Sequence, residues 1–93
     1  MAEEALKIRV TGRVQGVGFR WSTKAVADQL HIRGDVANQA DGSVIIHAVA
    51  DHAAMTAFAQ TIKQGPNKFV QVSTYEATPL ASTPKYDGFA VVG

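Results

Sequence analysis

The 93-residue chain contains no cysteine. This absence excludes disulfide bridges, thiolate metal sites and cysteine nucleophiles together. The formal net charge is only +1, so no strong field of one sign favours binding to nucleic acid or to an anionic membrane. We therefore expect neither partner.

Long hydrophobic runs are also missing. The longest apolar run, Ser43 to Ala50, is far shorter than the ~20 residues of a membrane helix. The amino-terminal stretch MAEEALK lacks the basic region and apolar run of a secretory signal. These features predict a cytoplasmic protein, and we expect a monomer. The length is typical of one domain, spanning residues 1–93.

Apolar and polar residues alternate from Leu6 to Val14, the period of a half-buried strand. The spacing turns helical from Trp21 to Leu30, with Trp21, Ala25 and Val26 on the expected buried face and Gly34 as the expected exit. Strands are predicted at 35–40, 43–50, 69–77 and 86–92, and the Asp41-Gly42 pair predicts a two-residue hairpin turn with positive φ at both positions.

A second helix is predicted after Asp51, a suitable N-cap. Its buried stripe should consist of Met55, Phe58, Ala59 and Ile62, and Gly65-Pro66 should end it. The order of elements predicts an α+β fold, a ferredoxin-like βαββαβ two-layer sandwich. Its sheet should be mixed but mostly antiparallel, with an additional C-terminal strand and with both helices on one face.

The stretch TGRVQGVGFR joins the first strand to the first helix. Gly16 and Gly18 lack a Cβ, so a ligand can approach the backbone there, and successive N–H groups can converge on an anion. The helix N-terminus and the guanidinium of Arg20 favour the same ligand class, a compact oxyanion such as phosphate. A simple chain reversal is the competing interpretation, because glycine-rich loops of this kind are common. The magnesium-nucleotide motif GxxxxGK[ST] is absent.

Two segments resemble the signatures of the acylphosphatase family. GRVQGVGFR, Gly12 to Arg20, is similar to G-x-V-Q-G-V-x-F-R at every fixed position, and GDVANQADGSV, Gly34 to Val44, resembles the second signature. Asp35 stands where an aromatic residue is usual, and Ala50 where a closing glycine is usual.

The resemblance implies a metal-independent and cofactor-free hydrolase that cleaves the carboxyl-phosphate bond of an acyl phosphate. Inorganic phosphate would be its product or inhibitor. Arg20 would bind the phosphoryl group, and Asn38 would position the attacking water. The phosphate-binding set implied by the resemblance is Gln15, Gly16, Val17, Gly18, Phe19 and Arg20.

Two alternatives stay open from the residues. The same loop could hold phosphate without turnover, as a non-catalytic anion-binding module of the kind found in larger proteins that handle carbamoyl phosphate. An RNA-recognition domain shares the element order, but the two expected central strands contain no aromatic residue on which a base could stack.

Three further expectations concern side chains. Phe19 should be buried beneath the loop, and Trp21 should belong to the same packing. His47 should lie on the open face of the sheet. Lys7, Arg9 and Arg13 are interpreted as a solvated cationic row on that face, with a weak polyanion patch as the alternative.

Overall fold

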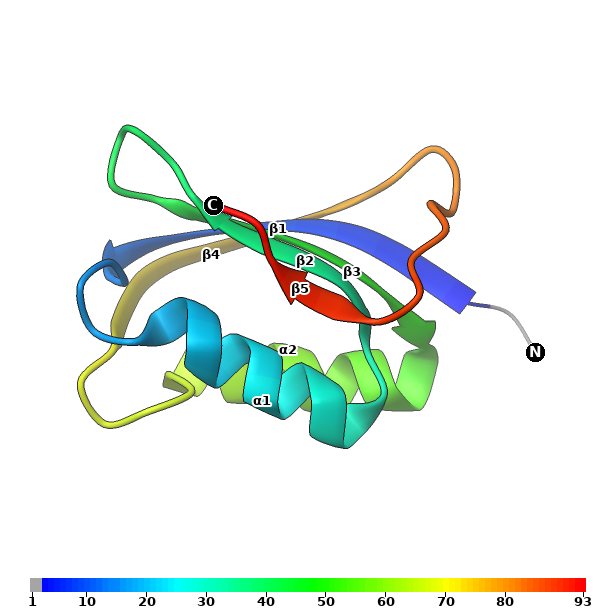
Figure 1. Ribbon diagram of the computed structural model, residues 1–93, viewed down its shortest axis with the longest axis horizontal. Coiled ribbons are helices and arrows are strands. Elements are labelled where there is room, and N and C mark those ends of the chain that lie inside the picture. The colour runs from blue at the N-terminus through cyan, green and yellow to red at the C-terminus, as the bar shows by residue number, and fades with distance from the viewer. Residues whose placement is uncertain (1–2) are drawn as a thin grey trace.

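The computed structural model describes residues 3–93 as a five-stranded sheet with two helices packed on one face (Figure 1). The strand order is β4-β1-β3-β2-β5, in which β2 and β5 pair in parallel and the other three neighbouring pairs are antiparallel. This arrangement confirms the predicted ferredoxin-like sandwich and its additional strand. The elements are β1 (Glu3–Arg13), α1 (Phe19–Leu30), β2 (Arg33–Asn38), β3 (Val44–Asp51), α2 (His52–Gln64), β4 (Gln71–Pro79) and β5 (Phe89–Val91).

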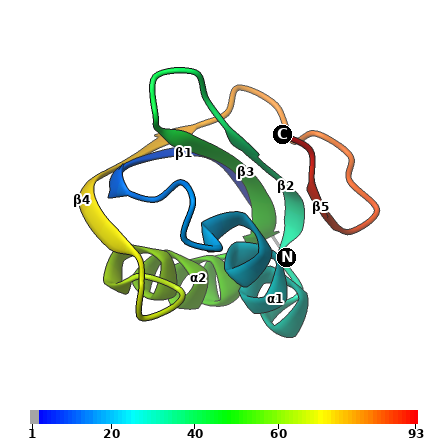
Figure 2. The same ribbon diagram turned by 60° about the vertical axis from the view of Figure 1, so that its left-hand side comes forward.

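The core lies between the sheet and the helix layer (Figure 2). Alternation places Ile8 and Val10 of β1 in this core, while Lys7 lies on the open face. Helix α2 contributes the predicted stripe of Met55, Phe58 and Ile62, and the carboxylate of Asp51 caps this helix by accepting the N–H of Ala54 at 2.9 Å. Among residues 3–93, no helix is long and apolar enough to cross a membrane.

The predicted buried face of α1 is wrong at Trp21 and Ala25, which are exposed, whereas Val26 does pack against the core. The buried residues are Phe19, Thr23 and Ala27, whereas 64% of the Trp21 surface is exposed. The helix begins at Phe19, whose ring is buried and fixes the helical phase. Trp21 follows two residues later, about 200° around the axis, and therefore faces outward.

The two predicted turns also differ from the structure. Helix α1 ends at Leu30, and its C-cap residue His31 adopts the left-handed conformation with φ 58°, so Gly34 is not the helix exit. Among residues 3–93, His31 is the one non-glycine residue with positive φ, so Asp41 does not take the predicted hairpin conformation. The β2–β3 connection is instead a longer loop, closed by hydrogen bonds from the N–H of Gln39 to the oxygen of Ser43 (2.8 Å) and from the N–H of Gly42 to the oxygen of Gln39 (3.2 Å).

Gly34 is required inside β2 by close contact with β3. A Cβ at this position would lie 1.7 Å from the main-chain oxygen of His47, and its φ of 149° disfavours other residues. Gly42 has a φ of 91° but has no atom within 4 Å of an added Cβ.

We predict that Gly34→Ala lowers the free energy of unfolding by about 3 kcal/mol or more, because it adds a backbone clash to an unfavourable dihedral. Gly42→Ala carries only the dihedral cost, roughly 1–2 kcal/mol. Urea unfolding of both variants measures the difference. Equal losses in the two variants would contradict the assigned close contact.

Candidate active site

The segment between β1 and α1 reverses the chain through two left-handed glycines. Gly16 has a φ of 75°, and Gly18 has a φ of 74° where it serves as the N-cap of α1. Phe19 follows with only 1% of its surface exposed, which confirms its predicted burial and fixes the end of the loop in the core. Figure 2 shows this segment between the sheet and the helix layer.

The first turn of α1 keeps its N–H groups available. Gly18 has no side chain to cap them, and the first turn contains no acidic residue. The N-terminal N–H groups of a helix have no partner within the helix and carry partial positive charge. Loop and helix together therefore present main-chain donors and a positive field to an anion.

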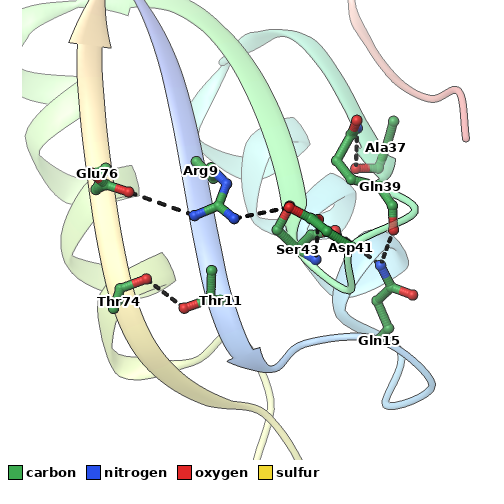
Figure 3. Close-up of polar contacts among 9 residues, drawn as sticks. All are labelled: Arg9, Thr11, Gln15, Ala37, Gln39, Asp41, Ser43, Thr74 and Glu76. Carbon is green, nitrogen blue, oxygen red and sulfur yellow. Dashed lines mark hydrogen bonds and ion pairs between the residues drawn. The ribbon is translucent and has the colours of Figure 1, made fainter.

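The side chain of Gln15 anchors one end of the loop to the β2–β3 connection. Its Nε2 donates to the main-chain oxygens of Gln39 and Ser43, each at 2.9 Å (Figure 3). The family resemblance implies a phosphate-binding role for the backbone of Gln15. The hydrogen bonds of its side chain are a structural role that the sequence analysis did not predict.

Asp41 stabilises the connection that Gln15 holds. Its carboxylate accepts the N–H of Ser43 at 3.0 Å and the Ser43 hydroxyl at 2.6 Å, and it pairs with Arg9 at 3.0 Å. These contacts, with the Ser43 hydrogen bonds first, hold the pKa of Asp41 well below its usual 3.8. Ser43 itself is buried.

Arg20 and Asn38 meet at the main-chain oxygen of Gly93. Nη1 of Arg20 donates to this oxygen at 2.7 Å, and the N–H of Asn38 donates to it at 3.0 Å. The two residues are thus within about two hydrogen-bond lengths of each other at these atoms. A guanidinium is planar and has five N–H donors. The hydrogen bond to Gly93 therefore orients the guanidinium plane and leaves other N–H groups free for a second acceptor.

Asn38 is the last residue of β2. It follows the alternation of buried Gly34 and Val36, so its side chain lies on the helix side of the sheet, the side of the loop. Its Oδ1 is buried and accepts no hydrogen bond from residues 3–93. This oxygen is therefore a buried acceptor whose hydrogen-bonding capacity is unused by residues 3–93.

Asn67 holds a second point of the loop, independently of Gln15. Its Nδ2 donates to the main-chain oxygen of Val17 at 3.0 Å and to the hydroxyl of Ser22 at 2.9 Å. The sequence contained one signal for this residue, since Asn after Gly-Pro is typical of an Asx-turn. Its partners at Val17 and Ser22 lie too far away in sequence for that signal to name them.

The polar groups of the open sheet face pair mainly with one another. Arg9 lies between Asp41 and Glu76, so it is paired rather than a free member of the predicted cationic row (Figure 3). His47 lies on this face as predicted, where its Nδ1 contacts Asp35 at 2.8 Å. Within residues 3–93, no group of three His, Cys, Asp or Glu side chains could hold a metal ion.

The fold and the loop define a small α+β domain with main-chain donors, an arginine and an asparagine gathered at one end of the sheet. The acylphosphatase family model matches residues 6–91. An acylphosphatase of Lacticaseibacillus paracasei is 48% identical over 93 residues, covering 100% of both chains, and one of Thermotoga maritima is 50% identical over 78 residues, covering 82% of this chain and 87% of its own.

The chain belongs to the acylphosphatase family, which confirms the resemblance found in its two signatures. The crystal structure of acylphosphatase from Bacillus subtilis superimposes with a TM-score of 0.92 at 34% identity, covering 99% of this chain and 100% of that one. Part of full-length HypF, in a phosphate- and nucleotide-bound form, shares the fold at 24% identity with a TM-score of 0.87, covering 99% of this chain and 12% of that one.

The lowered pKa of Asp41 predicts a pH-dependent contribution to stability. A carboxyl whose folded pKa lies below its unfolded value stabilises the protein above that unfolded value and loses the contribution as pH falls toward the folded pKa. We expect Asp41→Asn to lower the melting temperature at pH 7, and the difference from wild type to shrink as pH falls below 3.8. Thermal unfolding of both proteins between neutral and acidic pH measures this.

Glu76→Gln is the matched control, because it removes only the looser partner of Arg9, at 3.6 Å. Its effect at neutral pH should be the smaller one, since surface ion pairs contribute little. A pH-independent effect of Asp41→Asn would show that the carboxylate charge is not what stabilises the loop.

Proposed function

We propose that the chain hydrolyses acyl phosphates to a carboxylate and inorganic phosphate, with Arg20 and the loop amides binding the phosphoryl group and Asn38 orienting the attacking water. Family membership supports the hydrolysis itself. The observation that carries the residue assignment is the shared oxygen of Gly93, which holds Arg20 and Asn38 side by side next to the loop.

An acyl phosphate is a mixed anhydride whose leaving group is a carboxylate. A carboxylate departs at neutral pH without first receiving a proton, so the reaction needs no general acid on the leaving side. Phosphoryl transfer passes through a transition state with charge spread over the equatorial oxygens. Positioning and charge stabilisation can therefore provide most of the rate enhancement.

Arg20 supplies a permanent charge and a planar fork of donors. Its contact with Gly93 fixes one nitrogen, and the remaining N–H groups can bind two phosphoryl oxygens. The amides of residues 15–19, together with those of the first turn of α1, add neutral donors whose positions are set by the loop. Such preorganised donors gain strength where charge develops in the transition state.

Asn38 is suited to orient water rather than to deprotonate it. Its carboxamide is neutral, with an oxygen acceptor and two N–H donors. The buried Oδ1 can accept a hydrogen from a water, which directs a lone pair of that water toward phosphorus. The proton then passes to an oxygen of the substrate, because an amide is too weak a base to take it.

We predict that Asn38→Ala lowers kcat for benzoyl phosphate by roughly 10²–10³-fold, the usual loss for one transition-state hydrogen-bonding group. The inhibition constant of inorganic phosphate should change little, because Asn38 contacts the water and not the phosphoryl group. Steady-state kinetics with phosphate as competitive inhibitor measures both. Full turnover in this variant would contradict the assigned role.

Arg20→Ala should impair both turnover and phosphate inhibition, since the guanidinium binds the phosphoryl group in the ground state and in the transition state. Arg20→Lys should restore little, because a point charge lacks the planar fork. Arg33→Ala is the matched control, because it removes the same charge at the other end of β2. Equal effects of Arg20→Ala and Arg33→Ala would assign the result to net charge and overturn the proposal.

The same assay separates catalysis from simple binding. Release of benzoate by the wild-type protein supports the hydrolase. Inhibitor-like binding of phosphate with no release of benzoate would instead identify the non-catalytic anion-binding module.

A further inference from the structure

The carboxamide of Asn67 uses both its oxygen and its nitrogen within the protein. Its Nδ2 donates to the main-chain oxygen of Val17 at 3.0 Å and to the Ser22 hydroxyl at 2.9 Å. Its Oδ1 accepts the N–H of Phe69 at 2.8 Å. The side chain is partly buried, so these contacts are shielded in part from competing water. The α2–β4 loop is thereby attached to the loop that precedes α1.

The contact with Val17 determines the direction of a neighbouring N–H group. The oxygen of Val17 and the N–H of Gly18 belong to one peptide unit, and no peptide bond among residues 3–93 is cis. In a trans peptide the C=O and N–H bonds point in opposite directions. Because Asn67 holds the oxygen on its own side, the N–H of Gly18 points away from Asn67.

This peptide unit needs an external restraint. Gly18 and the nearby Gly16 lack side chains and populate positive and negative φ with similar ease. If the Val17–Gly18 peptide rotated, the N–H of Gly18 would no longer point the same way as the other main-chain N–H groups that the loop is expected to present to phosphate. The hydrogen bonds of the Gln15 side chain go to Gln39 and Ser43, at the other end of the loop.

Ser22 connects the restraint to α1. Its N–H donates to the oxygen of Gly18 at 3.0 Å, and its hydroxyl accepts from Asn67. Gly18 is therefore fixed at both of its peptide bonds. Asn67 holds the peptide before it by the oxygen of Val17, and Ser22 holds the peptide after it by the oxygen of Gly18. Asn67 lies close enough that a Cβ added to Gly18 would be 3.6 Å from Nδ2.

We propose that Asn67 is a positioning residue that directs the Gly18 N–H into the phosphate-binding loop, an inference that rests on the function proposed above. Asn67 lies outside both signature segments, in the loop after α2. It acts without touching the phosphoryl group, by holding the oxygen of Val17.

The test compares Asn67→Ala with Ser22→Ala, which removes one partner of Asn67 and leaves the Val17 contact. For Asn67→Ala we expect about tenfold lower kcat/KM for benzoyl phosphate and about tenfold weaker inhibition by inorganic phosphate, the effect of one lost hydrogen bond. For Ser22→Ala we expect about twofold changes or less. The ¹H–¹⁵N signal of Gly18 in the ligand-free protein should shift in Asn67→Ala.

Asn67→Asp keeps the oxygen that accepts the N–H of Phe69 and removes the Nδ2 donor. This variant therefore tests the hydrogen bond to Val17 while the turn of the α2–β4 loop is retained. Its readout is the Gly18 signal without ligand, because the added charge alters phosphate affinity by itself. We expect the Gly18 signal to shift as it does in Asn67→Ala.

A purely structural role predicts a different pattern. If Asn67→Ala lowers the melting temperature but keeps wild-type kcat/KM and phosphate inhibition, the proposal is overturned. If wild-type protein releases no benzoate, the proposed function fails. The ligand-free Gly18 signal then still decides the geometric claim, and an unchanged signal in both Asn67 variants refutes it.

Discussion

The main-chain oxygen of Gly93 links the two residues on which the proposed chemistry depends, through the side chain of Arg20 and the main-chain N–H of Asn38. Strand β5 pairs in parallel with β2, and Gly93 follows this strand. The N–H of Asn38 and the guanidinium of Arg20 both donate to the main-chain oxygen of Gly93. A long cationic side chain would otherwise occupy many rotamers in solvent. The segment that ends the edge strand therefore does more than extend the sheet, since the oxygen of Gly93 orients the guanidinium of Arg20 beside the end of β2.

The loop before α1 shows how a flexible sequence acquires a fixed set of donors. Glycines 16 and 18 permit the left-handed turns, but they do not select one arrangement of the peptide units. Selection comes from two carboxamides, Gln15 toward the β2–β3 connection and Asn67 from the α2–β4 loop. Buried Phe19 fixes the point at which the loop enters the helix. Preorganisation of this kind lets neutral amides stabilise developing charge without reorganising first.

The sequence was sufficient where the determining interactions are local. Alternation in β1, the Asp51 cap and the Met55, Phe58 and Ile62 stripe each depend on neighbours a few residues apart, and each was predicted correctly. The predicted face of α1 is wrong at Trp21, because the burial of Phe19 sets the helical phase and turns this apolar side chain outward, whereas Val26 packs against the core. Gly34 was assigned to a helix exit, because its contact with His47 becomes visible only once β2 and β3 are paired.

The same distinction applies to the candidate site. The signatures pointed to Arg20, Asn38 and residues 15–19, and family membership is now established, but the partners that hold these groups were invisible in the pattern. Arg20 and Gly93 are 73 positions apart, and Asn67 and Val17 are 50 apart. No local rule of spacing links such pairs, so only the folded chain brings them together.

Titration of the wild-type protein with inorganic phosphate, followed by ¹H–¹⁵N spectra, tests the central claim most directly. If the backbone loop and Arg20 together grip a phosphoryl group, the amide signals of residues 15–20 and the Arg20 side-chain signal shift together and saturate at one dissociation constant. Signals at the far end of the sheet, around Arg33, stay in place. Unmoved signals between residues 15 and 20 at saturating phosphate would contradict the account.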